Sequence, residues 1–149
     1  MKHIARKVAG VLATAGIVPV LLAGAAHADP GTVYFSSGAM QCSITGDGTV
    51  GCDLGSPMRL QYSFLPIPIP VNDIVIDQPL LPAHPTFAAG ARYTLPGGNP
   101  NLSGVRTADG QWGPIIEHAG AKCESGFHGS FTCTTKGHSF TVYSGNISA

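Results

Sequence analysis

A twelve-residue stretch at positions 41–52, QCSITGDGTVGC, decides how this chain folds. Its β-branched residues flank a Gly-Asp-Gly turn at 46–48, a pattern typical of a β-hairpin. A three-residue loop sets the flanking residues opposite one another in three pairs: Thr45 with Thr49, Ile44 with Val50, and Cys42 with Cys52. Opposed cysteines on paired strands can form a disulfide, so we predict a hairpin closed by a Cys42–Cys52 bridge.

The same arrangement recurs near the end of the chain. Cys123 and Cys133 enclose nine residues, as the first two cysteines do, and the segment turns about Phe127-His128-Gly129. Four cysteines allow three pairings, and the equal spacing favours two local bridges. We therefore predict a second hairpin closed by a Cys123–Cys133 disulfide.

Strand signals dominate the rest of the chain, because short β-branched and aromatic runs alternate with Gly, Asn, Asp and Ser. After residue 28 no window has the apolar spacing of a helix without an intervening Pro or Gly. The sequence predicts an all-β fold, a small disulfide-stapled β-sandwich or partly open barrel built from hairpins. The expected strands are 33–35, 40–45, 49–54, 60–64, 72–77, 91–95, 124–126, 130–134 and 139–143.

The central segment, residues 64–85, is rich in proline. Proline lacks a backbone donor, so we expect this segment at sheet edges and in extended loops. The prolines at 79, 82 and 85 fall at the period of polyproline II, which suggests either a docking ridge or, as we favour, a stiff crossover packed on the core. Asp73 and Asp77 could bind a cation or act as an acid/base pair, but we favour ordinary solvent-facing side chains.

The first 28 residues have the layout of a signal peptide. Three basic residues precede an uncharged apolar stretch at 8–25, and Ala26-His27-Ala28 then places small residues where a signal peptidase reads them. A membrane anchor needs about 20 unbroken apolar residues, whereas this stretch is shorter and holds three glycines and a proline. We predict cleavage after Ala28, no membrane span after cleavage, and a secreted chain of residues 29–149.

That secreted chain has the length of one domain and an acidic balance. Removal of residues 1–28 leaves five basic against eight acidic side chains, a net charge of −3. The remaining charges are dispersed, with no basic cluster to follow a phosphate backbone. Nucleic acid is therefore excluded as an expected partner.

No motif for catalysis, metal or cofactor binding stands out. The cysteines lack the short spacing of a zinc site. We interpret the histidines at 84, 118, 128 and 138 as turn and surface residues, with a weak metal site or a pH-sensitive contact as the alternative. There is no Gly-x-Ser-x-Gly elbow, no His-Glu-x-x-His helix and no phosphate-binding glycine loop. We expect no metal and no cofactor, and we assign no catalytic residue.

Three segments carry a resemblance to a known family: FSSGAMQC at 35–42, VGCDL at 50–54, and the second cysteine hairpin followed by GHSFTV at 137–142. They resemble small secreted actinobacterial proteins, of mycobacterial type, whose function is uncharacterised. Those proteins have a cysteine hairpin ending in Cys-Asp and a later one followed by Gly-His-Gly-Phe. The matched parts, 33–54 and 120–143, cover under half of the secreted chain, and this chain lacks the family's further cysteines and its tryptophan after Cys-Asp. The resemblance implies export but supplies no catalytic residue.

The residues of those motifs suit a scaffold. Gly38 would permit a tight turn, Asp53 would accept backbone donors from beyond its strand, and His138 would hydrogen-bond across its hairpin.

A binding site is expected, if anywhere, around exposed aromatic residues, which commonly anchor proteins or glycans. Phe127 and His128 lie at a predicted loop tip, and we add His138 and Trp112, although Trp112 could instead belong to the core. We expect an exported, non-catalytic protein, free or at the cell envelope, that binds a protein or an envelope component. The alternatives are a small secreted hydrolase with a dispersed Ser/His/Asp site and a purely structural or inhibitory secreted protein.

Overall fold

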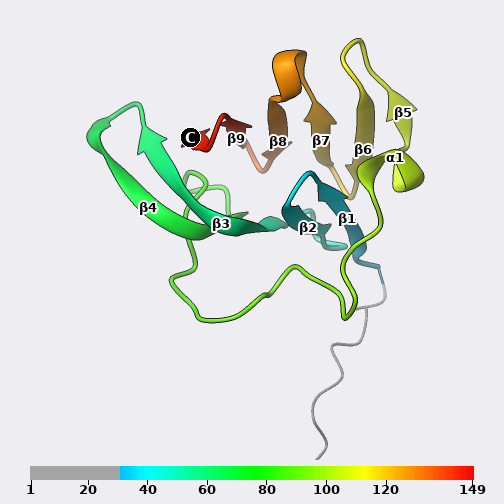
Figure 1. Ribbon diagram of the computed structural model, residues 1–149, viewed down its shortest axis with the longest axis horizontal. Coiled ribbons are helices and arrows are strands. Elements are labelled where there is room, and N and C mark those ends of the chain that lie inside the picture. The colour runs from blue at the N-terminus through cyan, green and yellow to red at the C-terminus, as the bar shows by residue number, and fades with distance from the viewer. Residues whose placement is uncertain (1–30) are drawn as a thin grey trace, which may run out of the picture.

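Ten strands form one curled sheet in the computed structural model, which describes residues 31–149 (Figure 1). The expected signal peptide and its cleavage site lie outside the described residues. Nine strands follow one another in the order β1-β2-β3-β10-β9-β8-β7-β6-β5, and β4 pairs with β3. The strands are β1 (Val33–Ser37), β2 (Met40–Ile44), β3 (Val50–Tyr62), β4 (Leu65–Ile76), β5 (Ala108–Asp109), β6 (Pro114–His118), β7 (Ala121–Ser125), β8 (Phe131–Thr135), β9 (His138–Tyr143) and β10 (Asn146–Ser148).

The all-β prediction is confirmed, and so are both cysteine hairpins. In the β2–β3 hairpin, Cys42 lies opposite Cys52, and their Cα atoms are 4.0 Å apart in a disulfide. Cys123 and Cys133 are opposed in the same way between β7 and β8, with Cα atoms 4.1 Å apart. Both bridges are fully buried, so they staple the hairpins from within the core.

The curl of the sheet comes from β3, which is longer than the two separate strands that the sequence predicts. Its first part, from Val50, pairs with β2 and β4, whereas its last part, near Leu60, pairs with β4 and, in parallel, with β10. The register with β4 shifts between Asp53 and Met58, where a bulge bends the strand. The two halves of the sheet therefore face each other as a half-barrel.

A single core fills the concave side of this half-barrel. Phe35 of β1 approaches Phe131 of β8, with ring centroids 6.2 Å apart, so the two arms of the sheet meet through aromatic side chains. The short helix α1 (Leu102–Val105) packs against β1 and β6 and buries Leu102. No helix within residues 31–149 has the length and apolar character needed to cross a membrane.

Three tight turns join consecutive strands, and two of them account for strands that the sequence did not predict. Ala119-Gly120, Lys136-Gly137 and Ser144-Gly145 each have positive φ at both residues and join β6 to β7, β8 to β9, and β9 to β10. Positive φ at both central residues defines the type I′ hairpin turn, whose twist matches that of paired strands. The first and the last of these turns thereby add β6 and β10 to the sheet, although β6 has only two β-branched residues and β10 only one.

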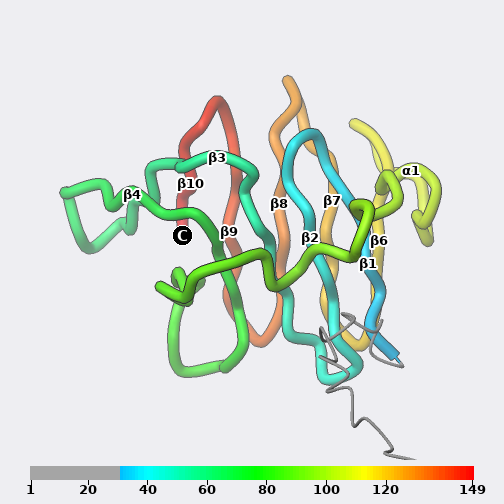
Figure 2. Tube along the Cα trace, turned by 60° about the horizontal axis from the view of Figure 1, so that its bottom comes forward, coloured from blue at the N-terminus to red at the C-terminus, as the bar shows by residue number. Residues whose placement is uncertain are grey.

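Residues 84–101 cross the outer face of the sheet and are called the strap here. Figure 2 shows this segment, green to yellow, running over β4, β3, β2 and β1. It begins beside β4, where His84 exchanges two backbone hydrogen bonds with Val75, and it ends beside β1, where Ser36 donates to the Pro100 carbonyl. The strand predicted at 91–95 is wrong, because those residues belong to the strap.

The proline-rich segment lies where its missing donors are tolerated. Among residues 31–149, β4 pairs with no strand other than β3, and its prolines at 66, 68 and 70 fall on alternate residues of this edge strand. After β4 the chain turns at Pro79 and Leu80, so residues 79–85 are not a continuous polyproline helix. Leu80 is 87% exposed whereas Ala83 is buried, so only part of the crossover packs on the core.

Candidate functional site

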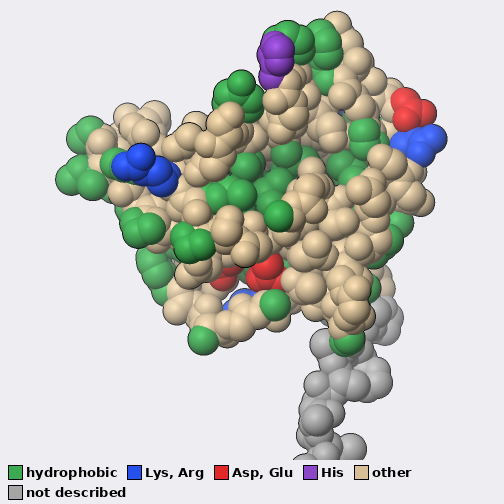
Figure 3. All heavy atoms as spheres, in the orientation of Figure 1, with side chains coloured by type: hydrophobic (Ala, Val, Ile, Leu, Met, Phe, Trp, Pro, Cys, Tyr) green, Lys and Arg blue, Asp and Glu red, His purple; other side chains and the backbone are tan. Residues whose placement is uncertain are grey.

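Three of the four candidate binding residues come together at one end of the sheet. Trp112 and Phe127 have ring centroids 4.7 Å apart with their planes tilted by 60°, and the Phe127 ring lies 3.8 Å from that of His128. Trp112 is 53% exposed and Phe127 is 55% exposed, so neither belongs to the core. We call these three residues the aromatic tip. In Figure 3 a histidine with hydrophobic side chains beside it stands at the top of the molecule, over the ends of β7 and β8.

Two neighbouring loops hold the aromatic tip. Trp112 lies in the β5–β6 turn, which is closed by a 2.8 Å hydrogen bond from the Gly110 N–H to the Gly113 carbonyl. Phe127 begins the 3₁₀ turn η1 (Phe127–Gly129) between β7 and β8, where the Gly126 N–H donates to the Ser130 carbonyl at 2.7 Å. Both loops are thus tied by their own backbone.

The β6–β7 register explains why the two rings meet. Ile115 pairs with Glu124, and continuing this register for three residues brings Trp112 opposite Phe127. A Cβ on Gly113 would come within 2.9 Å of the Ser125 Cβ, so the two loops approach closely only because residue 113 is glycine. Tertiary pairing, rather than proximity in sequence, builds the tip.

His128 has a backbone conformation that is uncommon for a side-chain-bearing residue. Its φ is +54°, in the left-handed region, and Gly129 follows with φ +77°. Histidine is among the residues that tolerate this region better than most. The left-handed turn leaves His128 exposed beside the Phe127 ring.

Charges around the aromatic tip are paired. Arg106 and Asp109, near the β5–β6 turn, form an ion pair at 2.8 Å. Lys122 and Glu124, on β7 below η1, form another at 2.8 Å. The tip is therefore flanked by mutually compensated charges rather than by a field of one sign.

His138, the fourth candidate, lies elsewhere. It follows the Lys136-Gly137 turn, at the opposite end of β8 from η1, and its Nε2 lies 2.9 Å from the Pro79 carbonyl. It does not make the cross-hairpin hydrogen bond that we expected. His118 is the last residue of β6 and pairs with Ala121, at the end of β7 away from η1. Its Nε2 lies 2.6 Å from the Gly31 carbonyl.

His84 and Asp77 form the one histidine–carboxylate pair among residues 31–149, at 3.1 Å. His84 Nε2 contacts Asp77, and Nδ1 lies 3.2 Å from the Pro85 carbonyl. Both ring nitrogens are thus engaged, and neither faces a serine hydroxyl. This contact ties the start of the strap to the end of β4.

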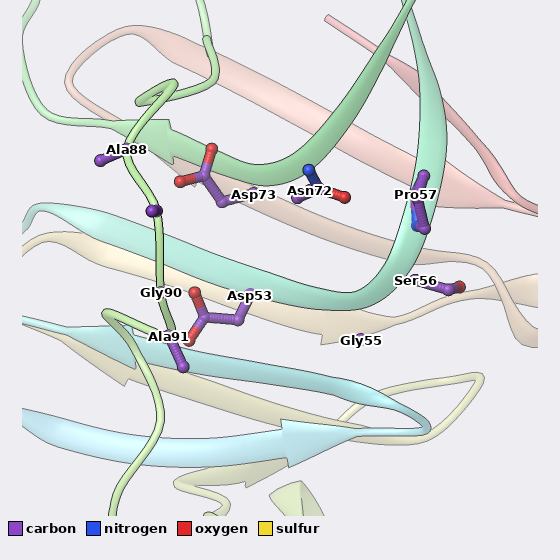
Figure 4. Close-up of a pocket in the computed structure, with 10 residues that line it drawn as sticks. Asp53, Gly55, Ser56, Pro57, Asn72, Asp73, Ala88, Gly90 and Ala91 are labelled. Atoms are coloured by element: carbon purple, nitrogen blue, oxygen red, sulfur yellow. The ribbon is translucent and has the colours of Figure 1, made fainter.

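A cavity of about 330 Å³ lies between the strap and strands β3 and β4 (Figure 4). The carboxylates of Asp53 and Asp73 both point toward the strap there. Asp53 accepts from the backbone N–H groups of Arg92, at 3.1 Å, and Tyr93, at 2.8 Å, and from the Thr94 hydroxyl at 2.6 Å. The expectation that Asp53 takes donors from beyond its strand is confirmed.

Asp73 corrects the expectation of a solvent-facing carboxylate. Its side chain is buried, and it accepts hydrogen bonds from both the backbone N–H and the hydroxyl of Thr86. A buried carboxylate needs such partners, because burial without them is costly. In this cavity Asp53 and Asp73 fasten the strap to the sheet.

Tyr93 and Asn99 also hold the strap against the sheet. Burial, together with the negative charges of Asp73 and Asp53, raises the pKa of Tyr93 to about 12. The Asn99 amide nitrogen lies within hydrogen-bonding distance of the Phe35, Cys42 and Tyr93 carbonyls, at 2.8–3.1 Å. No local sequence pattern marks either residue, because the sheet residues that they contact are distant in the chain.

The first hairpin loop carries a separate polar cluster. Asp47 accepts hydrogen bonds from the Thr45 hydroxyl and from the Thr49 backbone, and it meets Lys136 at 3.3 Å. The Thr45 hydrogen bond, followed by that from the Thr49 backbone, holds the pKa of Asp47 well below its usual range. The cluster joins the β2–β3 loop to the β8–β9 turn and serves the scaffold.

Comparison with protein-family models, with curated proteins and with solved structures found no significant match to this chain.

Proposed function

We propose that this protein is an exported, non-catalytic module that binds a component of the cell envelope through its aromatic tip. The observation that carries the proposal is the Trp112–Phe127 pair, two large rings held 4.7 Å apart and each more than half exposed. A buried aromatic ring removes about 150–250 Å² from water, so rings presented on fixed loops are available to stabilise a complex.

The rigidity of the support favours a binding role. The Cys123–Cys133 disulfide joins β7 to β8 directly below η1. A contact surface that is already ordered loses less conformational entropy when it binds. The tip therefore offers preformed contacts on a covalently stapled scaffold.

Export is supported by two independent features. The first is the signal-peptide layout of residues 1–28, with small residues at Ala26 and Ala28. The second is that all four cysteines form disulfides, which persist in oxidising, extracytoplasmic compartments. The resemblance to small secreted actinobacterial proteins agrees with export.

The proposal is tested by retention of the oxidised 29–149 chain on intact cells and fractionated envelope of the organism that makes it. Saturable retention is expected, and Trp112→Ala and Phe127→Ala should reduce it. Phe64→Ala is the matched control, because Phe64 is a 71% exposed phenylalanine that lies outside the aromatic tip, at the β3–β4 turn. Retention no greater than that of a reduced, unfolded sample, or equal in all variants, would overturn the proposal.

A further inference from the structure

We propose that the ligand of the aromatic tip is an uncharged carbohydrate, bound by stacking on Trp112 and Phe127. This inference rests on the proposed function and deepens it, because it assigns a chemical class to the envelope component.

The two rings supply an apolar surface with two orientations. Their planes are tilted by 60°, so they form the walls of an angle rather than one flat platform. A sugar ring has an apolar face of C–H groups that can pack on an aromatic ring, while its hydroxyls project from the rim. A ligand that is apolar on a face and polar at its edge suits half-exposed rings with polar neighbours.

Polar side chains lie on the same two loops as the rings. Ser125 and Ser130 flank the η1 loop, and Gln111 precedes Trp112 in the exposed turn. The side chains of these three residues and of His128 make no hydrogen bond to another residue within 31–149. Hydroxyl, amide and imidazole groups both donate and accept hydrogen bonds, as recognition of sugar hydroxyls requires.

The charge balance selects against other ligands. Within the part of the chain that the structure describes, the ion pairs Arg106–Asp109 and Lys122–Glu124 leave no excess charge beside the tip. A polyanion or an anionic lipid surface would call for unpaired lysine or arginine there. An uncharged ligand needs no such field.

The apolar area also favours a small contact. Half of two aromatic side chains amounts to on the order of 200 Å². A specific protein–protein interface buries about 800 Å² on each partner. The two rings alone would therefore cover one or two sugar units, whereas a protein partner would need a much larger contact surface around them.

The chain contains a single tryptophan, which makes the test direct. Because Trp112 is the only indole, its fluorescence and its quenching by acrylamide report occupancy of the tip alone. The oxidised 29–149 chain is titrated with soluble uncharged polysaccharides built from glucose, mannose, galactose or arabinose. A polyuronate and vesicles of anionic phospholipid are titrated in parallel.

The expected result is that at least one uncharged polysaccharide protects Trp112 from acrylamide, with saturation. Phe127→Ala, which keeps the reporter, should weaken this binding about three- to tenfold, and Phe64→Ala should leave it unchanged. Near-ultraviolet circular dichroism of both variants checks that each is folded.

The outcomes separate this inference from the proposed function. If the envelope retains the chain in a tip-dependent way but only the polyuronate or the vesicles protect Trp112, the carbohydrate assignment is overturned and the binding function stands. The carbohydrate assignment is also overturned if no uncharged polysaccharide protects Trp112. Absence of any retention on the envelope overturns the proposed function itself.

Discussion

The ring of Tyr93 lies directly against the backbone of Gly51, so that a Cβ on residue 51 would overlap the ring. Gly51 belongs to β3 and Tyr93 to the strap, 42 residues further along the chain. The contact is possible because glycine has no side chain. It brings the middle of the strap into close contact with the sheet.

Gly51→Ala should therefore loosen the strap. Overpacking of a filled site costs about 1–3 kcal/mol, and we expect a loss of that size in the free energy of unfolding, measured by urea denaturation. In a Tyr93→Ala background the same change should cost less, because the clashing ring is then absent.

Gly104→Ala is the control for this change. Gly104 lies in α1, and a Cβ there would have no neighbour within 4 Å. Alanine is the better helix former, so this variant should be neutral or up to about 1 kcal/mol more stable. Equal losses at positions 51 and 104 would refute the packing argument.

Asn99→Ala should destabilise the end of the strap that lies beside β1 and β2. The change leaves the Phe35 and Cys42 carbonyls without their amide donor and the Leu95 N–H without its acceptor. At about 1 kcal/mol for each lost hydrogen bond, the expected loss is roughly 2–3 kcal/mol in urea denaturation. Asn72→Ala, at an exposed position of β4, should change stability by less than about 0.5 kcal/mol.

Each disulfide should contribute a similar amount to stability. Both close loops with a sequence separation of 10 residues, for which a chain-entropy model gives about 2–3 kcal/mol each. We expect Cys42→Ala/Cys52→Ala and Cys123→Ala/Cys133→Ala to lower the unfolding free energy by that amount. Mass spectrometry of non-reduced peptides checks the pairing, and a fragment joining Cys42 to Cys123 or Cys133 would contradict it.

Alkaline pH should destabilise the protein through Tyr93. The pKa of its phenol rises from 10.0 to about 12 in the folded protein, so the folded state retains a proton that the unfolded chain releases. The resulting stability is complete below pH 10 and is lost as pH rises from 10 to 12. Burial also raises the pKa of Tyr62, which adds to the loss in the same direction.

Tyr93→Phe isolates this effect, because it keeps the ring and removes the titrating hydroxyl. Its unfolding free energy should fall less steeply between pH 10 and pH 12 than that of the unmodified protein. The same slope in both proteins would show that Tyr93 does not titrate as described.

The prolines of β4 should keep the edge of the sheet from pairing with another molecule. Since alternate residues of a strand direct their backbone groups to one side, the donors missing at 66, 68 and 70 all lie on one side of β4, and in an edge strand that side faces solvent. Replacing the three prolines by threonine would restore the donors and expose a pairing edge.

We expect this triple variant to self-associate in sedimentation velocity at concentrations where the unmodified chain does not. Pro79→Thr/Pro82→Thr, outside the strands, is the control and should not associate. A monomeric triple variant would assign the prolines another role.

The hairpin turns show how much more local sequence could have predicted. Each of the dipeptides Ala119-Gly120, Lys136-Gly137 and Ser144-Gly145 ends in the glycine that a type I′ turn accommodates. Reading them as turns would have predicted β6 and β10. The strand expected at 91–95 was wrong for the converse reason, since its composition suits a strand but its backbone donors go to Asp53 rather than to a neighbouring strand.

The sequence by itself determined the all-β class, the two cysteine hairpins and their disulfides, because loop length sets strand register over about ten residues. Only the tertiary structure decided the curl of the sheet, the parallel β3–β10 pair, the path of the strap and the assembly of the aromatic tip. Asn99 meets Phe35 across 64 residues, and Trp112 meets Phe127 only once β6 and β7 are in register. Such contacts depend on how distant segments pack together, and no short stretch of sequence specifies them.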